Sequence, residues 1–247
     1  MNSILNISAY KFVPLADLAN LKADLVSQTQ ARQLKGTILI AEEGINLFLA
    51  AAKESVRDFL SWLKSDQRFS DLWAKESWSD HQPFNKMRIK IKSEIIRMNH
   101  PAIQPQAGRA PAISPEQLDQ WLDQGHDDQG REVVLLDTRN AFEVSHGSFK
   151  GAIDLGIKKF SDFPEALSSH SNDFTGKTVV SFCTGGIRCE KAAIYMREMG
   201  LQDTFQLEGG ILNYFEKTTA RHYQGDCFVF DDRELLDPQL AVSSQAK

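Results

Sequence analysis

The first part of the chain alternates short runs of β-forming residues with two amphipathic helical stretches. The stretches at 15–34 and 53–64 repeat apolar residues at a helical period. The β-forming runs lie at 4–13, on both sides of a predicted hairpin turn at 42–44, and at 86–98. The resulting order of strand, helix, strand, strand, helix, strand predicts a ferredoxin-like α+β domain.

The pattern changes from about residue 131 onward. Continuous apolar runs of strand length end at Asp137, at Cys183 and before Gly209, and a helical stretch at 188–199 lies between the last two. Such runs are typical of strands that are covered on both faces. The alternation of buried strands with helices predicts a parallel α/β sheet.

The segment 99–112 separates these two patterns and contains three prolines. Prolines in such a segment favour a linker over a regular element. We therefore expect four parts: a ferredoxin-like domain at 1–100, a linker at 101–112, an α/β domain at 113–222 and a tail at 223–247.

Composition excludes several classes of protein. The net charge of -5 argues against a protein covered in positive charge, although it permits a local basic patch. No run approaches the roughly 18 apolar residues of a membrane helix, and the N-terminus lacks the pattern of a signal peptide. Three cysteines are too few for a disulfide framework, which favours the reducing cytoplasm. Because no spacing of cysteines and histidines suits a metal, we expect no metal site.

The most informative motif is the loop CTGGIRC, which begins at Cys183 where a predicted buried strand ends. Two glycines allow backbone N–H groups to point inward, and the start of a helix and an arginine add positive charge. These features stabilise a thiolate and would equally stabilise a persulfide anion, so we predict that Cys183 is a nucleophile. A buried structural cysteine would need none of them. The predicted anion cradle consists of Thr184, Gly185, Gly186, Ile187 and Arg188.

Other residues near this loop have two interpretations each. Asp137 and Arg139 follow a predicted strand and could act in catalysis, although an ion pair that fixes the loops is the favoured interpretation. Cys189 could resolve an oxidised or persulfidated Cys183 into a disulfide, or could serve only packing. We expect Cys227 to be a core thiol.

A row of four cations marks the predicted strand at 86–98. Side chains two residues apart share a face of a strand, so the cations line one face and Met87, Ile89 and Ile91 should face the core. A solvated edge guarded by lysine would explain the row, but so would binding of a polyanion. These candidate polyanion-binding residues are Lys86, Arg88, Lys90 and Lys92.

The loop and its neighbours together resemble a known domain. CTGGIRC is similar to the rhodanese active-site loop, LLDTRNAFEVSHGSFKGAIDL to the segment upstream of it, and QLEGGILNYF to the segment downstream. The related phosphatases carry a loop that is one residue longer, so the loop length here favours sulfur. The resemblance implies that 113–222 is a rhodanese-like catalytic domain.

The whole layout resembles one family, the oxygen-dependent tRNA uridine hydroxylases, in which an acylphosphatase-like domain precedes the rhodanese domain. ILIAEEGINLFLA, PFNKMRIKIKSEII and GDCFVFDDR carry the likeness beyond the loop. It implies 5-hydroxylation of uridine 34 in tRNA through an activated, persulfide-type Cys183, with molecular oxygen as co-substrate. The sequence departs from the family pattern in two ways. A leucine and a phenylalanine follow EGIN, where glycine and threonine are usual. The cysteine-rich C-terminal extension that many members carry is also missing, so we expect no metal-linked role.

An alternative function is a rhodanese-type sulfurtransferase that passes persulfide sulfur from a donor to an acceptor. No flavin, haem or iron site is legible in the sequence, so no cofactor is predicted. We expect tRNA as a partner, bound at the row of four cations at 86–92, and a sulfur donor if Cys183 carries a persulfide, without a membrane or an obligate protein partner.

Overall fold

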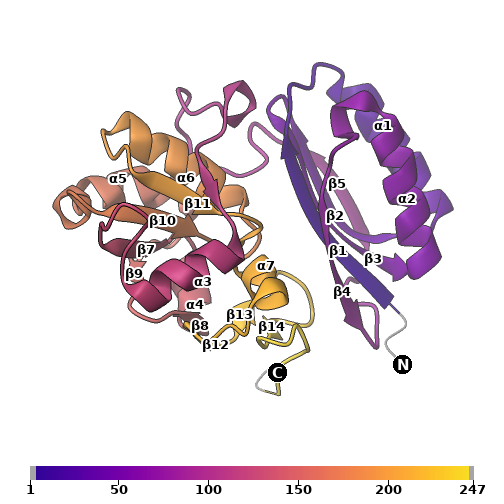
Figure 1. Cartoon of the computed structure of the whole chain (residues 1–247). Helices are drawn as coiled ribbons and strands as arrows, with labels where there is room; N and C mark the ends of the chain where they lie inside the picture. Colours follow the sequence, from indigo (N-terminus) through magenta and orange to yellow (C-terminus); the bar gives the residue numbers. More distant parts are fainter. Residues whose placement is uncertain (1–3, 245–247) are drawn as a thin grey trace. The chain divides into compact units, whose positions relative to one another are not determined.

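The computed structural model describes residues 4–244, apart from the side chains of 171 and 172 (Figure 1). Residues 1–3 of the predicted first domain and 245–247 of the predicted tail lie outside the described part. The chain forms two units, which we describe separately. Unit 1 comprises Met1–Ile96 with Asp231–Arg233, and unit 2 comprises Arg97–Phe230 with Glu234–Lys247.

Unit 1 contains a five-stranded sheet with the order β4-β1-β3-β2-β5. The first four strands have the ferredoxin-like order, with β1 antiparallel to both β3 and β4. Both helices cover the same face of the sheet (Figure 1), and they bury its apolar side. The elements are β1 (Ile4–Phe12), α1 (Leu18–Ala31), β2 (Lys35–Ala41), β3 (Gly44–Ala52), α2 (Lys53–Ser65), η1 (Gln67–Phe69), β4 (Ala74–Ser79) and β5 (Met87–Ile91).

The structure corrects the position of the last ferredoxin-like strand. Sequence analysis placed it at 86–98, but β4 at Ala74–Ser79 occupies that place beside β1. The sequence AKESWS has little apolar character, so it gave no strand signal. β5 is an additional edge strand that runs parallel to β2.

The predicted inward face of β5 is only partly correct. Met87 and Ile89 pack against the core of unit 1, whereas Ile91 is 44% exposed. The reason is that β5 pairs with a neighbour on one side only and ends the sheet.

The EGIN motif has a structural role in unit 1. The predicted hairpin is confirmed, since β2 and β3 pair antiparallel up to Ala41 and Gly44. The Glu43 side chain accepts a hydrogen bond of 2.7 Å from the backbone N–H of Ile95, and the Asn46 side chain donates one of 3.3 Å to the carbonyl of Ile95. These bonds fix the chain after β5 against the hairpin.

Unit 2 contains a five-stranded parallel sheet with the order β6-β11-β10-β7-β9. Every residue of β10 is buried, as expected of a strand covered on both faces, and helices lie on either side of the sheet (Figure 1). The main elements are β6 (Ala112–Ile113), α3 (Pro115–Gln124), β7 (Val133–Asp137), α4 (Ala141–Val144), β9 (Ile153–Asp154), α5 (Phe163–Ser168), β10 (Thr178–Phe182), α6 (Ile187–Glu198), β11 (Thr204–Leu207) and α7 (Gly210–Lys217).

Residues of the predicted linker and tail also take part in regular structure. Ile103 and Ala110 are buried, and β6 begins within the segment 101–112. In the tail, Arg233 donates a 2.8 Å hydrogen bond to the Ser77 hydroxyl of β4. The short elements are η2 (Pro105–Ala107), β8 (Gly147–Phe149), η3 (Phe160–Asp162), η4 (Ser171–Phe174), β12 (Tyr223–Gly225), β13 (Cys227–Phe228) and β14 (Leu235–Leu236).

Within residues 4–244, no helix is both long and apolar enough to cross a membrane.

Candidate active site

Cys183 lies directly after β10 and is only 1% exposed. The chain turns at Gly186, whose φ of +98° is in the left-handed region that glycine adopts without strain, and α6 begins at Ile187. The N–H of Gly186 donates a 3.1 Å hydrogen bond to Sγ of Cys183, and the N–H groups of Arg188 and Cys189 also point to this sulfur. The loop therefore surrounds the sulfur with backbone donors at a helix N-terminus.

This environment changes the pKa of Cys183. Burial alone would raise it, but a hydrogen bond from the Cys189 thiol, the positive charge of Arg188 and the backbone N–H groups lower the pKa to about 5. Cys183 is therefore a thiolate at neutral pH, which is the nucleophilic form.

The guanidinium of Arg188 is held by a carboxylate that sequence analysis did not select. Glu143 on α4 accepts two hydrogen bonds from Arg188, of 2.6 and 2.7 Å, and both side chains are buried. Glu143 also accepts a 3.1 Å bond from the N–H of Asn140 in a capping box. The spacing of Asn140 and Glu143 was the available sequence signal, because it is typical of a helix start.

Asp137 and Arg139 form an ion pair in which neither side chain is exposed. Arg139 donates to both carboxylate oxygens of Asp137 and, over 2.6 Å, to the carbonyl of Gly147. Ser148 donates a further bond of 2.7 Å to Asp137. The pair thus joins the end of β7 to the start of β8, which is the geometry expected of an ion pair that fixes the loops.

The carbonyls of the loop are fixed by α7. The N–H groups of Ile211 and Leu212 donate to the carbonyls of Cys183 and Thr184, over 2.9 and 3.1 Å. Gly210 has a φ of +65°, and a Cβ at this position would lie 2.3 Å from the carbonyl oxygen of Cys183. Only glycine permits this approach, which explains the second glycine of QLEGGI.

The remaining predicted cradle residues lie around the same loop. The Thr184 hydroxyl donates to the carbonyl of Phe228 over 3.4 Å, Gly185 is half-buried, and Ile187 is buried at the start of α6. The structure therefore brings together all the predicted residues from Cys183 to Cys189.

The other two cysteines are buried thiols. Burial and the neighbouring Cys183 thiolate raise the pKa of Cys189, which also contacts the Thr138 hydroxyl at 3.8 Å. Burial raises the pKa of Cys227 to about 12, against the opposing positive charge of Arg139. Of the three cysteines, only Cys183 carries a negative charge at neutral pH.

This difference predicts selective alkylation of Cys183. Iodoacetamide should label it fastest, with a rate that increases with pH through about 5 and is constant at neutral pH. Below that pKa the rate should fall about tenfold for each pH unit, because the thiolate fraction falls by that factor. Timed peptide mapping measures all three cysteines. Faster labelling of Cys189 or Cys227 would contradict the assignment.

An aromatic cluster adjoins the loop and was missed by sequence analysis. Phe142, Phe228 and Phe230 meet edge to face, with ring centroids 5.1–6.3 Å apart, and His146 stacks on Phe228 at 5.7 Å. Phe142 precedes Glu143 on α4, and Phe228 accepts the bond from Thr184. Phe142 and Phe230 are 46% and 54% exposed, which is unusual for phenylalanine.

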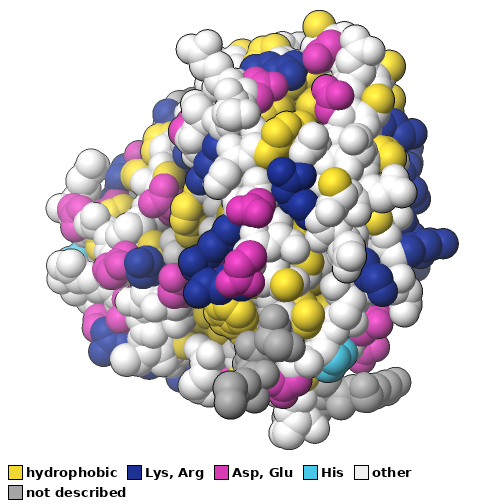
Figure 2. Space-filling model, turned by 90° about the vertical axis from the view of Figure 1, so that its right-hand side faces the viewer, with side chains coloured by type: hydrophobic (Ala, Val, Ile, Leu, Met, Phe, Trp, Pro, Cys, Tyr) yellow, Lys and Arg dark blue, Asp and Glu magenta, His cyan; other side chains and the backbone are white. Residues whose placement is uncertain are grey.

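The four predicted cations of unit 1 are all exposed on the edge strand. Arg88 and Lys90 lie within β5, and Lys86 and Lys92 flank it, held by backbone hydrogen bonds to Gly36 and Ile40 of β2. On the face drawn in Figure 2, basic side chains are interspersed with acidic and apolar ones.

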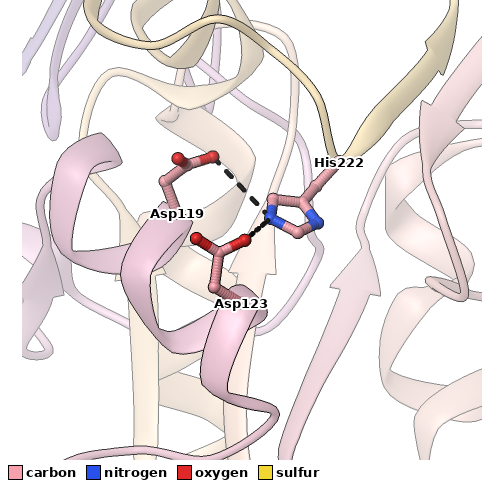
Figure 3. A group of neighbouring side chains, drawn as sticks. All are labelled: Asp119, Asp123 and His222. Carbon is pink, nitrogen blue, oxygen red and sulfur yellow. Dashed lines mark hydrogen bonds and ion pairs between the residues drawn. The ribbon is translucent and has the colours of Figure 1, made fainter.

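Asp119, Asp123 and His222 form the group of potential metal ligands found in the described part of the chain (Figure 3). Their ligand atoms lie within 4.8 Å of one another. However, the guanidinium of Arg221 contacts both carboxylates, and the Tyr214 hydroxyl donates to Asp119. These partners already supply positive charge and donors, so the group is explained as an ion-pair network.

Two family models match consecutive parts of the chain. Residues 4–95 match the family model of the UPF0176 acylphosphatase like domain, and residues 114–217 match that of the rhodanese-like domain. Among solved structures, the rhodanese-like domain of an Anabaena protein aligns with 47% of this chain and 79% of its own, at 18% identity and a TM-score of 0.37.

Curated relatives match nearly the whole chain. The tRNA uridine(34) hydroxylase of Ralstonia nicotianae is 60% identical over 96% of this chain and 84% of its own length. Those of Variovorax paradoxus and Bordetella petrii are 62% and 59% identical over 98% of this chain, and over 92% and 96% of their own lengths.

Proposed function

The chain belongs to the tRNA uridine(34) hydroxylase family, and from this we propose that it hydroxylates C5 of uridine 34 in tRNA through Cys183. It is an enzyme of tRNA modification with a rhodanese domain. Our proposal concerns the position that is hydroxylated, the residues that act and the second substrate.

The observation that carries the proposed role of Cys183 is its stabilised thiolate. Backbone donors and the charge of Arg188 hold a negative charge on its sulfur at neutral pH. A thiolate is the form of cysteine that attacks an electrophile or accepts a sulfur atom. The same cradle would hold the terminal anion of a persulfide.

The aromatic cluster supports a nucleobase as the group that approaches this thiolate. Phe142 and Phe230 expose flat apolar rings beside the loop, and bases stack on such rings irrespective of sequence. The contacts of Phe228 with Phe142 and of Thr184 with Phe228 connect the cluster to the residue after Cys183. We propose that these rings hold bases of the anticodon loop near Cys183.

Replacing Phe142 and Phe230 singly with alanine should therefore weaken tRNA binding. The expected loss is about 1–3 kcal/mol for each stacked base. Met199 at the end of α6 is also exposed and apolar, so Met199→Ala is a matched control that should leave affinity unchanged. Fluorescence anisotropy with labelled tRNA measures the three variants. Equal affinities would exclude stacking on the cluster.

We further propose molecular oxygen as the co-substrate and the cytoplasm as the site of action. Hydroxylation places one new oxygen atom on C5 and removes two electrons from the base, and dioxygen can both supply the atom and accept the electrons. Three unpaired cysteines, one of them a thiolate, suit the reducing compartment that contains tRNA.

Nucleoside mass spectrometry is the direct test of this function. Unmodified tRNA incubated with the protein, oxygen-18 gas and a thiol reductant should gain 5-hydroxyuridine that carries the heavy isotope. The Cys183→Ser protein should give none, because serine is not ionised at neutral pH. If the product lacks the heavy isotope, oxygen gas is not the source. If no product forms with the wild-type protein, the proposed function fails.

A second candidate function is sulfur transfer from a donor to an acceptor. The observation that favours it is the short loop, with four residues between Cys183 and Arg188, whose donors suit a persulfide. Sulfur transfer from thiosulfate to cyanide measures this activity. Transfer without any 5-hydroxyuridine would favour the sulfurtransferase.

A further inference from the structure

We propose that Cys183 and Cys189 act as a redox dithiol that supplies two electrons for hydroxylation and becomes a disulfide in each turnover. This inference rests on the proposed function. It assigns a catalytic role to Cys189, and it explains why repeated turnover would need an external reductant.

The stoichiometry of hydroxylation creates the requirement. Converting the C5–H bond to C5–OH takes two electrons from uridine, whereas reduction of dioxygen to the level of two water oxygens takes four. Two electrons must therefore come from elsewhere. Oxidation of two thiols to a disulfide provides this number.

The geometry of the loop brings two sulfur atoms together. Cys183 directly follows β10 and Cys189 is the third residue of α6, so the turn at Gly186 brings the start of the helix close to the end of the strand. The Cys189 thiol donates a hydrogen bond to the Cys183 sulfur, and it also contacts the Thr138 hydroxyl. Cys183 is 1% exposed and Cys189 is 0% exposed, so both thiols are shielded from bulk solvent.

The two cysteines also differ in the way that disulfide formation requires. Cys183 is the thiolate and reacts first, while Cys189 keeps its proton and stays unreactive until Cys183 has been oxidised. The third cysteine lacks this arrangement, because the Cys227 sulfur contacts a backbone carbonyl on β13.

The overall step balances in atoms and electrons. The Cys183 thiolate, the Cys189 thiol, one proton, dioxygen and the C5–H group give the disulfide, water and C5–OH. The O–O, C5–H and S–H bonds break, and C5–O, S–S and O–H bonds form in the products. One oxygen atom is placed on the base and the other leaves as water, so uridine and the dithiol each lose two electrons. A thiol reductant then reopens the disulfide.

A single-turnover experiment tests this scheme. The full-length protein is reduced, freed of reductant without air, mixed with unmodified tRNA and exposed to dioxygen. After acid quenching and N-ethylmaleimide labelling, mass spectrometry measures 5-hydroxyuridine and the peptide that contains both cysteines. We expect at most one 5-hydroxyuridine per protein and an equal amount of Cys183–Cys189 disulfide. Added dithiothreitol should restore repeated turnover.

The Cys189→Ser protein separates electron supply from positioning. Serine still donates a hydrogen bond to Cys183, so rapid alkylation at neutral pH should persist, but it cannot form the disulfide. Its single-turnover yield without reductant should fall below about a tenth of the wild-type yield. Cys227→Ser is the control and should keep both the product and the disulfide.

The outcomes are distinguishable. Formation of 5-hydroxyuridine in the wild-type protein with both thiols still free would overturn the dithiol role and leave the proposed function intact. An undiminished single-turnover yield from the Cys189→Ser protein would do the same. Absence of product even with dithiothreitol and oxygen would overturn the proposed function together with this inference.

Discussion

Replacing Arg188 with alanine is expected to lower the free energy of unfolding by about 3–5 kcal/mol. The reason is that Glu143 would stay buried with its charge but without its cation. The same change removes a positive charge that lowers the pKa of Cys183, so that pKa should rise and hydroxylation should fall by orders of magnitude. Urea unfolding and the pH profile of alkylation measure the two effects.

Two further variants distinguish these effects. In the double variant Glu143→Gln/Arg188→Met the buried carboxylate and its cation are both removed, so no charge is left unpaired and most of the stability should return. Its Cys183 pKa should stay high, because the guanidinium is still absent. Arg188→Lys should restore only part of both properties, since one ammonium cannot reproduce the two parallel bonds to Glu143. An Arg188→Ala protein with native stability and a native alkylation profile would disprove this role of the ion pair.

The part of the site that sequence analysis found is local in the chain. Cys183 and the five residues after it are contiguous, and a strand that ends before a glycine turn and a helix determines their geometry. The residues of the Asp137–Arg139 pair are also only two positions apart. In such cases residue types and spacing are sufficient to predict which groups meet.

The contacts that were missed join residues distant in sequence. Glu143 and Arg188 are separated by 45 positions, and Phe142 meets Phe228 only after β13 folds back beside α4. The periodicity of apolar residues predicts local elements, but it does not predict contacts between residues so far apart in the sequence. A different reason applies to β4, whose lysine, glutamate and serines conceal a strand that backbone pairing with β1 stabilises. Because this strand gave so weak a signal, the last ferredoxin-like strand was predicted at 86–98 instead of at Ala74–Ser79.

The edge strand provides the second large expected effect. Changing Arg88 and Lys90 to alanine should weaken tRNA binding by about 10- to 30-fold near physiological salt, if each cation contacts one phosphate. The expectation follows from counterion release. In a plot of log affinity against log salt concentration, each phosphate contact makes the slope more negative by about 0.7–0.9. Both side chains are exposed, so the fold should be little affected.

The matched control removes two exposed cations from α2 of the same unit, through Arg57→Ala/Lys64→Ala. Both double variants lose the same net charge, so a difference between them reports the position of the charge. Affinity for tRNA is measured at several salt concentrations. The Arg88/Lys90 variant should flatten the log–log slope by about 1.4–1.8 units, and the control should keep the wild-type slope.

The salt dependence also decides between the two interpretations of the row. If β5 is only a solvated edge, its lysines and arginine prevent association with other sheets and contribute no phosphate contact. Both double variants would then bind tRNA equally. Phosphate binding at Arg221 would not replace the row easily, because its guanidinium already pairs with Asp119 and Asp123. Selective loss in the Arg88/Lys90 variant, with sulfur transfer to cyanide unchanged, would identify β5 as the strand that holds the polyanion.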